Sequence, residues 1–95
     1  MCKIEVILNN ETGLHARPAS MLVKEASKYK SKIALLKDQV EYDAKSIISV
    51  LKMGATKGDK ITFLFNGDDE KEALQGIKEL LKKIVMDENK TSLCI

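Results

Sequence analysis

The chain has 95 residues, which is enough for one domain with a modest core. Hydrophobic residues make up 44% and charged residues 32% of the sequence, a balance that indicates a folded globular protein and excludes a disordered chain. A net charge of +2 does not favour a nucleic-acid or membrane partner, and no apolar run approaches the roughly 20 residues that span a bilayer. The N-terminus lacks the apolar core of a signal peptide, so we expect a cytoplasmic protein.

The N-terminal part of the chain predicts a strand, a loop and a helix. Residues Cys2–Leu8 alternate between apolar and polar, as in a half-buried strand, and the segment NNETG that follows is typical of a loop. Apolar residues then recur at helical spacing and predict a helix over about Ala16–Tyr29. Pro18 is tolerated only in the first turn of a helix, where its missing N–H costs nothing, so the helix should start at His15 or Ala16.

The middle of the chain predicts a hairpin and a short helix. Ser31–Lys37 and Val40–Ala44 are two expected strands, joined by a turn in the segment KDQ. Ile47–Met53 is expected to form a short apolar helix, and Gly54 can supply the left-handed residue that ends it.

The C-terminal part predicts a strand and the longest helix. Lys60–Asn66 alternates as a strand, and apolar residues at helical spacing continue as far as Ile84. Asp69 with Glu72 resembles a capping pair at the start of this helix. We expect one domain over residues 1–86, followed by a polar tail over residues 87–95 that is either frayed or tucks back through its last residues, SLCI.

The predicted order is βαββαβα. This order favours an α+β fold with one mostly antiparallel sheet and its helices on one face. The two cysteines, Cys2 and Cys94, lack the spacing of metal ligands, and we expect two reduced thiols near the chain ends.

The only histidine, the only arginine and the only proline of the chain are His15, Arg17 and Pro18. A helix N-terminus leaves backbone N–H groups unpaired and carries a partial positive charge, so it can bind an anion and keep a neighbouring imidazole neutral and nucleophilic. Such an imidazole can attack a phosphoryl group and hold it as a P–N adduct against the N–H groups of Ala16 and Arg17. The guanidinium can add a forked contact, and Pro18 stiffens the helix start.

The sequence contains no GxxxxGK[ST] loop and no carboxylate cluster for Mg²⁺, so we expect no cofactor and no metal site. The chain must then receive its phosphoryl group from a partner and pass it on. The residues alone leave a second interpretation open, in which His15 is an ordinary loop histidine, Arg17 a surface charge and Pro18 a common helix starter.

Two segments resemble the signatures of one family. GLHARPAS, residues 13–20, resembles the active-site signature of HPr, the histidine-containing phosphocarrier of the bacterial phosphoenolpyruvate–sugar phosphotransferase system. DAKSIISVLKMGATKGD, residues 43–59, resembles the second HPr signature in its Gram-positive form. The resemblance covers about residues 1–86. It implies an open-faced β-sandwich in which a four-stranded antiparallel sheet carries three helices on one face.

The resemblance also implies roles and partners. His15 matches the histidine that enzyme I phosphorylates at Nδ1 and that enzyme IIA domains dephosphorylate, and Arg17 matches the arginine that stabilises this phosphate. The chain would be a stoichiometric carrier with a transient phosphohistidine, not an enzyme, and we expect a monomer. Ser46 matches a serine phosphorylated by HPr kinase/phosphorylase in Gram-positive relatives, where a catabolite control transcription factor is a further partner. Ser46 is also a favoured N-cap for the helix that starts at Ile47.

A partner-docking surface follows from the helix after Ser46, which is apolar nearly all round and cannot bury every side. The family uses this surface and the start of the first helix for its partners. The residues that we expect to contact partners are Ser20, Met21, Lys24, Ile47, Ile48 and Leu51. The alternative is that these apolar residues are all core, which we accept for Val50.

Other functions remain as alternatives. The chain could be a regulatory HPr-like binding module that acts through Ser46, or a carrier in a nitrogen-linked phosphotransfer chain. A small acylphosphatase would need a glycine-rich phosphate cradle after the first strand, which is absent here. An RNA binder would need aromatic stacking residues on adjacent strands, and the chain has only two Phe and two Tyr.

Overall fold

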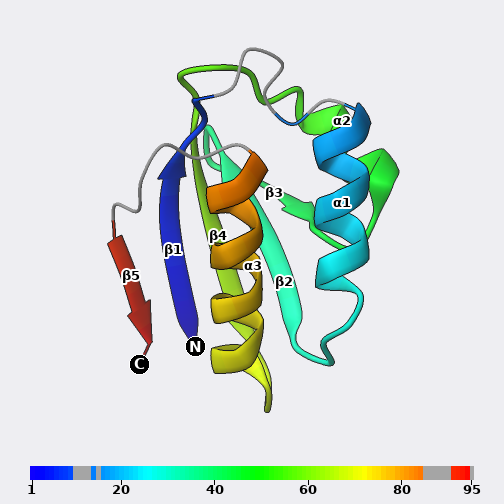
Figure 1. The fold of residues 1–95 in the computed structure, drawn as a ribbon. Helices are drawn as coiled ribbons and strands as arrows, with labels where there is room; N and C mark the ends of the chain where they lie inside the picture. Colours follow the sequence, from blue (N-terminus) through cyan, green and yellow to red (C-terminus); the bar gives the residue numbers. More distant parts are fainter. Residues whose placement is uncertain (10–13, 15, 85–90, 95) are drawn as a thin grey trace.

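The structure is a computed structural model that describes residues 1–9, 14, 16–84 and 91–94. Strands and helices follow one another as expected until the end of the last helix, after which the chain adds one more strand (Figure 1). The elements are β1 (Cys2–Ile7), α1 (Ala16–Ala26), β2 (Lys32–Lys37), β3 (Val40–Asp43), α2 (Ile47–Met53), β4 (Lys60–Asn66), α3 (Glu70–Ile84) and β5 (Thr91–Cys94).

The strands form one antiparallel sheet in the order β3-β2-β4-β1-β5. The βαββαβα arrangement of an open-faced sandwich is confirmed, with the helices over one face of the sheet (Figure 1). The fifth strand was not predicted: Thr91–Cys94 was assigned to a polar tail, of which only the alternative that SLCI tucks back agrees with the structure. Four residues that include Thr and Ser carry too little apolar alternation to predict a strand, and pairing along the β1 backbone is what places them.

The core lies between the sheet and the helices. Strand alternation turns every second side chain of β1, β2 and β4 toward the helices, and the amphipathic stripes of α1 and α3 cover them. The largest fully buried side chains are Phe63, Phe65, Ile4, Leu8, Leu14, Leu22, Ile33, Leu35, Ile61, Ile77, Leu81 and Val6. The site residues therefore stand on a scaffold whose positions are fixed by close packing.

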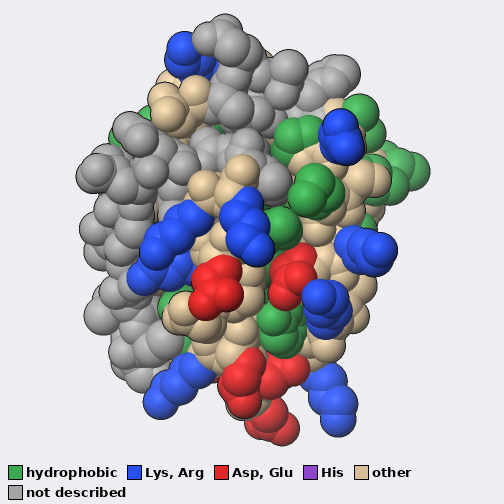
Figure 2. Space-filling model, in the orientation of Figure 1, with side chains coloured by type: hydrophobic (Ala, Val, Ile, Leu, Met, Phe, Trp, Pro, Cys, Tyr) green, Lys and Arg blue, Asp and Glu red, His purple; other side chains and the backbone are tan. Residues whose placement is uncertain are grey.

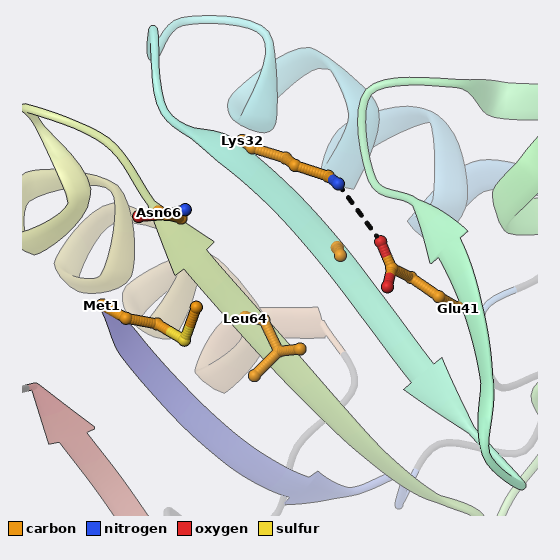
Figure 3. Close-up of a pocket in the computed structure, with 6 residues that line it drawn as sticks. Met1, Lys32, Glu41, Leu64 and Asn66 are labelled. Carbon is orange, nitrogen blue, oxygen red and sulfur yellow. Dashed lines mark ion pairs between the residues drawn. The ribbon is translucent and has the colours of Figure 1, made fainter.

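None of the described helices covers the opposite face of the sheet. A shallow hollow on this face is lined by Met1, Lys32, Ala34, Glu41, Leu64 and Asn66 (Figure 3). An exposed ion pair of 3.4 Å between Lys32 Nζ and Glu41 Oε2 crosses it from β2 to β3 (Figure 3). None of the predicted site residues lines this hollow.

Helix α1 is shorter than predicted, since it ends at Ala26 and not at Tyr29. After Ala26 the backbone tightens, because the Lys28 N–H donates to the Glu25 carbonyl and the Tyr29 N–H to the Ala26 carbonyl, each three residues back. The Ser27 hydroxyl also donates to the Val23 carbonyl at 2.8 Å, and it shares this carbonyl with the Ser27 backbone N–H in the last turn.

The predicted turns are confirmed by their backbone angles. Asp38 (φ 52°) and Gln39 (φ 69°) are both left-handed, which is the geometry of a two-residue hairpin turn between β2 and β3. Gly54 (φ 65°, ψ 34°) ends α2 as the left-handed cap, and its N–H donates to the Leu51 carbonyl at 3.1 Å.

The predicted capping pair of Asp69 and Glu72 is wrong. The Asp69 carboxylate accepts from the backbone N–H groups of Lys30 and Ser31, both at 2.9 Å, and from the Ser31 hydroxyl. The acid that reaches back across the start of α3 is Glu70, which accepts from the Gly67 N–H at 3.1 Å. Asp69 therefore ties the start of α3 to the loop before β2, and the bond from the Ser31 hydroxyl, with those from the two amides, lowers its pKa to about 2.

This lowered pKa predicts a stability loss in acid. The unfolded Asp69 carboxyl has an ordinary pKa near 3.8, so protonation favours the unfolded chain as the pH falls from about 4 to about 2. Asp69→Asn lacks the stabilisation that the ionised carboxylate provides, so the variant should unfold more easily than wild type at pH 5. We expect this difference in unfolding free energy to shrink as the pH falls from about 4 to about 2. Urea midpoints measured from pH 5 to pH 2 test this, with the exposed Asp68→Asn as matched control. A deficit that stays constant to pH 2 would contradict the prediction.

The pairing of β1 with β5 at the edge of the sheet places the two cysteines opposite each other. Cys2 on β1 and Cys94 on β5 are paired Cα partners in the antiparallel ladder. Cys2 is buried and disulfide-bonded, so the expectation of a reduced thiol at this position is wrong. The sequence spacing of 92 residues gave no signal of this pairing, which depends on β5 being a strand.

Candidate functional site

Helix α1 begins at Ala16, one of the two starts predicted from Pro18. Pro18 is the third residue of the helix and lies half-buried in its first turn, while Ala16 and Arg17 are exposed. The first-turn N–H groups have no carbonyl partner within the helix and are available to an anion. His15 lies outside the described residues, as do residues 10–13 of the preceding loop, so its predicted position is not tested.

The backbone on both sides of His15 is nevertheless held in place. Leu14 is 2% exposed, and its N–H donates to the Ala55 carbonyl at 3.1 Å in the loop after α2. On the other side, Ala16 is the first residue of α1. Sequence reasoning missed the Leu14 anchor, because a single apolar residue in a loop carries no periodic signal.

Arg17 has no hydrogen bond or ion pair within the part of the chain that the structure describes. Two lysines, Lys28 and Lys45, differ in this respect. Lys28 is paired with Glu25 at 2.9 Å, and the Lys45 ammonium donates to the Tyr29 carbonyl at 2.6 Å. The exposed guanidinium of Arg17 at the helix start is therefore not engaged by any described residue and can bind a phosphoryl group in its forked geometry.

Ser46 is the N-cap of α2. Its backbone is extended (φ −117°, ψ 117°), and its hydroxyl accepts from the Ser49 N–H at 3.2 Å. The Ser49 hydroxyl accepts in turn from the Asp43 N–H at 2.8 Å. The predicted capping role is confirmed, and the half-buried hydroxyl stands directly before Ile47.

We expect Ser46→Ala to lower the free energy of unfolding by about 1 kcal/mol, because the Ser49 N–H loses its partner. Ser46→Asp keeps an acceptor oxygen and should retain most of the stability. Chemical denaturation measures both. Ser20→Ala on the exposed face of α1 is the matched control and should be close to neutral. Equal effects of the Ser46 and Ser20 alanine variants would show that the cap contributes nothing.

An exposed apolar patch spans the neighbouring helices α1 and α2. Met21 is 40% exposed, Ile48 74% and Leu51 42%, with Ile47 beside them, whereas Val50 is fully buried as predicted. We call Met21, Ile47, Ile48 and Leu51 the α1/α2 patch. Figure 2 shows hydrophobic side chains gathered over these helices with Lys and Arg side chains beside them. Four large apolar side chains left in solvent on adjoining helices are typical of a contact surface.

Polar residues border the α1/α2 patch. Ser20 and Lys24 are exposed on α1, and Lys24 makes no ion pair within the described part of the chain. A shallow hollow beside the patch is lined by Met21, Lys24, Glu25, Lys28 and Leu80. The contribution of α3 to this hollow was not predicted, since it depends on how α1 and α3 pack.

Comparison with known proteins identifies the family. The family model described as the PTS HPr component phosphorylation site matches residues 2–83 of the chain. The chain belongs to the PTS HPr family. The resemblance seen in the two sequence signatures is therefore confirmed.

Individual HPr relatives agree along nearly their whole length. The chain is 44% identical over 84 residues to the phosphocarrier protein HPr of Mycoplasma pneumoniae, covering 87% of this chain and 96% of the relative. The solved structure of a Mycoplasma histidine-containing phosphocarrier protein superposes with a TM-score of 0.86 at 37% identity, covering 90% of this chain and 99% of that one. The catabolite-repression protein Crh of Bacillus subtilis, described as a dimer with a swapped domain, gives a TM-score of 0.70 at 34% identity, covering 86% and 94%.

Proposed function

We propose that this HPr-family chain accepts a phosphoryl group from enzyme I on His15 and donates it to a histidine of an enzyme IIA domain. The observation that carries the proposal is the start of α1 at Ala16, the residue after His15 in the chain, with the exposed guanidinium of Arg17, which has no hydrogen bond or ion pair to the described residues. Family membership supports the same role, because the matched family model is that of a phosphorylation site.

The transfer needs little from the protein beyond position and charge. A neutral His15 nitrogen attacks phosphorus in line, the P–N bond to enzyme I breaks, and a new P–N bond forms on His15. Helix N–H groups at Ala16 and Arg17, with the Arg17 guanidinium, offset the negative charge of the transferring group. The same contacts serve the second transfer, in which a histidine of enzyme IIA attacks and His15 leaves. The chain is thus a stoichiometric carrier.

Docking of both partners is assigned to the α1/α2 patch with Ser20 and Lys24 at its border. The patch lies on α1, which starts at the residue after His15 in the chain, and on the neighbouring α2, so a partner that covers the patch lies against the helix that follows the acceptor. The exposed ammonium of Lys24 can steer an acidic partner toward this surface. Enzyme I and enzyme IIA then use one surface in turn, which suits a cytoplasmic monomer that shuttles between them.

Ser46 is the proposed regulatory site. An HPr kinase/phosphorylase would place a phosphate on the hydroxyl that now caps α2, beside Ile47 of the patch. A dianion within an apolar contact surface disfavours partners that bury it, and it can recruit a partner with matching arginines, such as a catabolite control transcription factor.

The test is transfer of labelled phosphate from phosphoenolpyruvate. We expect acid-labile label on the chain only when enzyme I is present, and loss of that label when an enzyme IIA domain is added. Label that never leaves the chain would contradict the carrier role. Absence of label from enzyme I, combined with acid-stable label on Ser46 from ATP and the kinase, would favour a regulatory binding module instead.

A further inference from the structure

The two ends of the chain meet at one edge of the sheet. The start of β1 and the end of β5 lie side by side (Figure 1), and the register opposes Cys2 to Cys94. Cys2 is 1% exposed and disulfide-bonded, and Cys94 is the only other cysteine in the sequence. We propose that Cys2 and Cys94 form a reversible disulfide that fastens the terminal strand β5 to β1.

The register suits such a bond. Directly opposed residues of an antiparallel pair have Cα atoms about 4.5 or 5.5 Å apart, depending on the pair type, and both values lie within the roughly 4.4–6.8 Å that disulfides span. Opposed residues also direct their side chains to the same face of the sheet. Cys2 shares this face with the buried Ile4 and Val6, so the bond would be shielded from solvent.

The oxidant is a low-molecular-weight disulfide, RSSR. One cysteine thiolate attacks it, which forms a mixed disulfide and releases one RS⁻. The second cysteine then attacks the sulfur of the first, closes the intramolecular bond and releases the second RS⁻. Two protein thiols are oxidised and one RSSR is reduced to two RSH. Because Cys2 is buried while β5 is docked, exchange at this sulfur proceeds while β5 is detached.

The consequence is a redox-sensitive edge. With the bond closed, β5 occupies the hydrogen-bonding edge of β1 and the covalent loop spans residues 2–94, nearly the whole chain. With the bond open, as in a reducing cytoplasm, only the backbone ladder of a four-residue strand covers that edge. An uncovered edge is a template for another strand, so the closed bond protects the monomer.

The experiment equilibrates the full chain with glutathione and glutathione disulfide, in native buffer and in concentrated urea, and titrates free thiols after acid quenching. If β1–β5 pairing holds the cysteines together, the ratio of closed to open protein is on the order of 10²-fold higher in native buffer than in urea. The closed form should also melt on the order of 10 °C above the reduced form. Equal ratios in the two solvents, or disulfide-linked dimers as the main product, would overturn the proposal.

A register variant provides the matched control. Leu93 is opposed to Lys3, and neighbouring residues of a strand point to opposite faces. In the double variant Cys94→Ser with Leu93→Cys, the ratio of closed to open protein should therefore no longer be higher in native buffer than in urea. In urea the variant should form its disulfide to the same extent as wild type. If it closes as readily as wild type in native buffer, the β5 register does not hold the cysteines and the assignment fails.

Discussion

His15→Ala leaves the chain without acid-labile phosphate after incubation with enzyme I and phosphoenolpyruvate. The expected loss is complete, because the sequence contains no second histidine that could form a P–N adduct. Phosphate incorporation is measured before and after mild acid treatment, on the variant and on wild type at equal concentration. Thermal melting of both proteins establishes that the variant is folded.

The control is Lys71→Ala, which changes an exposed residue on α3 outside the proposed docking surface and should accept phosphate as wild type does. Acid-labile phosphate that persists on a folded His15→Ala chain would contradict the assignment of the nucleophile. Because the chain has one histidine, the acceptor would then belong to another residue class, and mapping the labelled peptide would identify it.

Arg17→Ala should slow phosphoryl transfer from enzyme I by about 10²–10³-fold, the usual effect of removing one donor that faces transition-state charge. Arg17→Lys should recover part of the loss, since an ammonium keeps the charge but not the forked geometry. Rapid-quench kinetics at saturating enzyme I measure the chemical step. Arg17 is exposed and makes no hydrogen bond or ion pair within the described part of the chain, so unfolding free energies should stay close to wild type.

Lys24→Ala distinguishes an effect on association with the partner from an effect on the phosphoryl-transfer step. Lys24 is an exposed cation on the same helix, and its removal should lower the association rate and its salt dependence while leaving the saturated rate unchanged. Equal saturated rates for Arg17→Ala and wild type would show that the guanidinium does not contact the transferring phosphoryl group. A reduced saturated rate for Lys24→Ala would show that a positive charge elsewhere on α1 also accelerates the chemical step, so that the effect is not specific to Arg17.

Most elements were predictable because their signals are local. Alternation in β1 and β4, the Pro18 constraint on α1 and the left-handed stop at Gly54 each depend on a few neighbouring residues. The hairpin turn at Asp38 and Gln39 is of the same kind. Where a short stretch of sequence determines the backbone, periodicity and turn chemistry were enough.

Contacts between distant segments were not predictable. The Asp69 carboxylate satisfies amides 38 and 39 residues away, so its proximity to Glu72 suggested a cap that does not form. β5 depends on the open edge of β1, which exists only once the sheet has formed. At the site, the linear motif predicted the helix start and the Ser46 cap, but the Leu14 anchor and the α3 side of the hollow beside Met21 required the packed structure.

The bond from Lys45 to the Tyr29 carbonyl ties the segment that follows α1 to the residue that precedes the cap of α2. The segments next to the two helices of the contact surface are therefore joined by this bond, and the helices themselves pack together through the core. A carrier must associate and dissociate once in each half of its cycle, and a surface that needs no ordering at each encounter loses little conformational entropy. Rigidity of this kind permits modest affinity with rapid exchange between successive partners, which is the property that turnover of a shuttle requires.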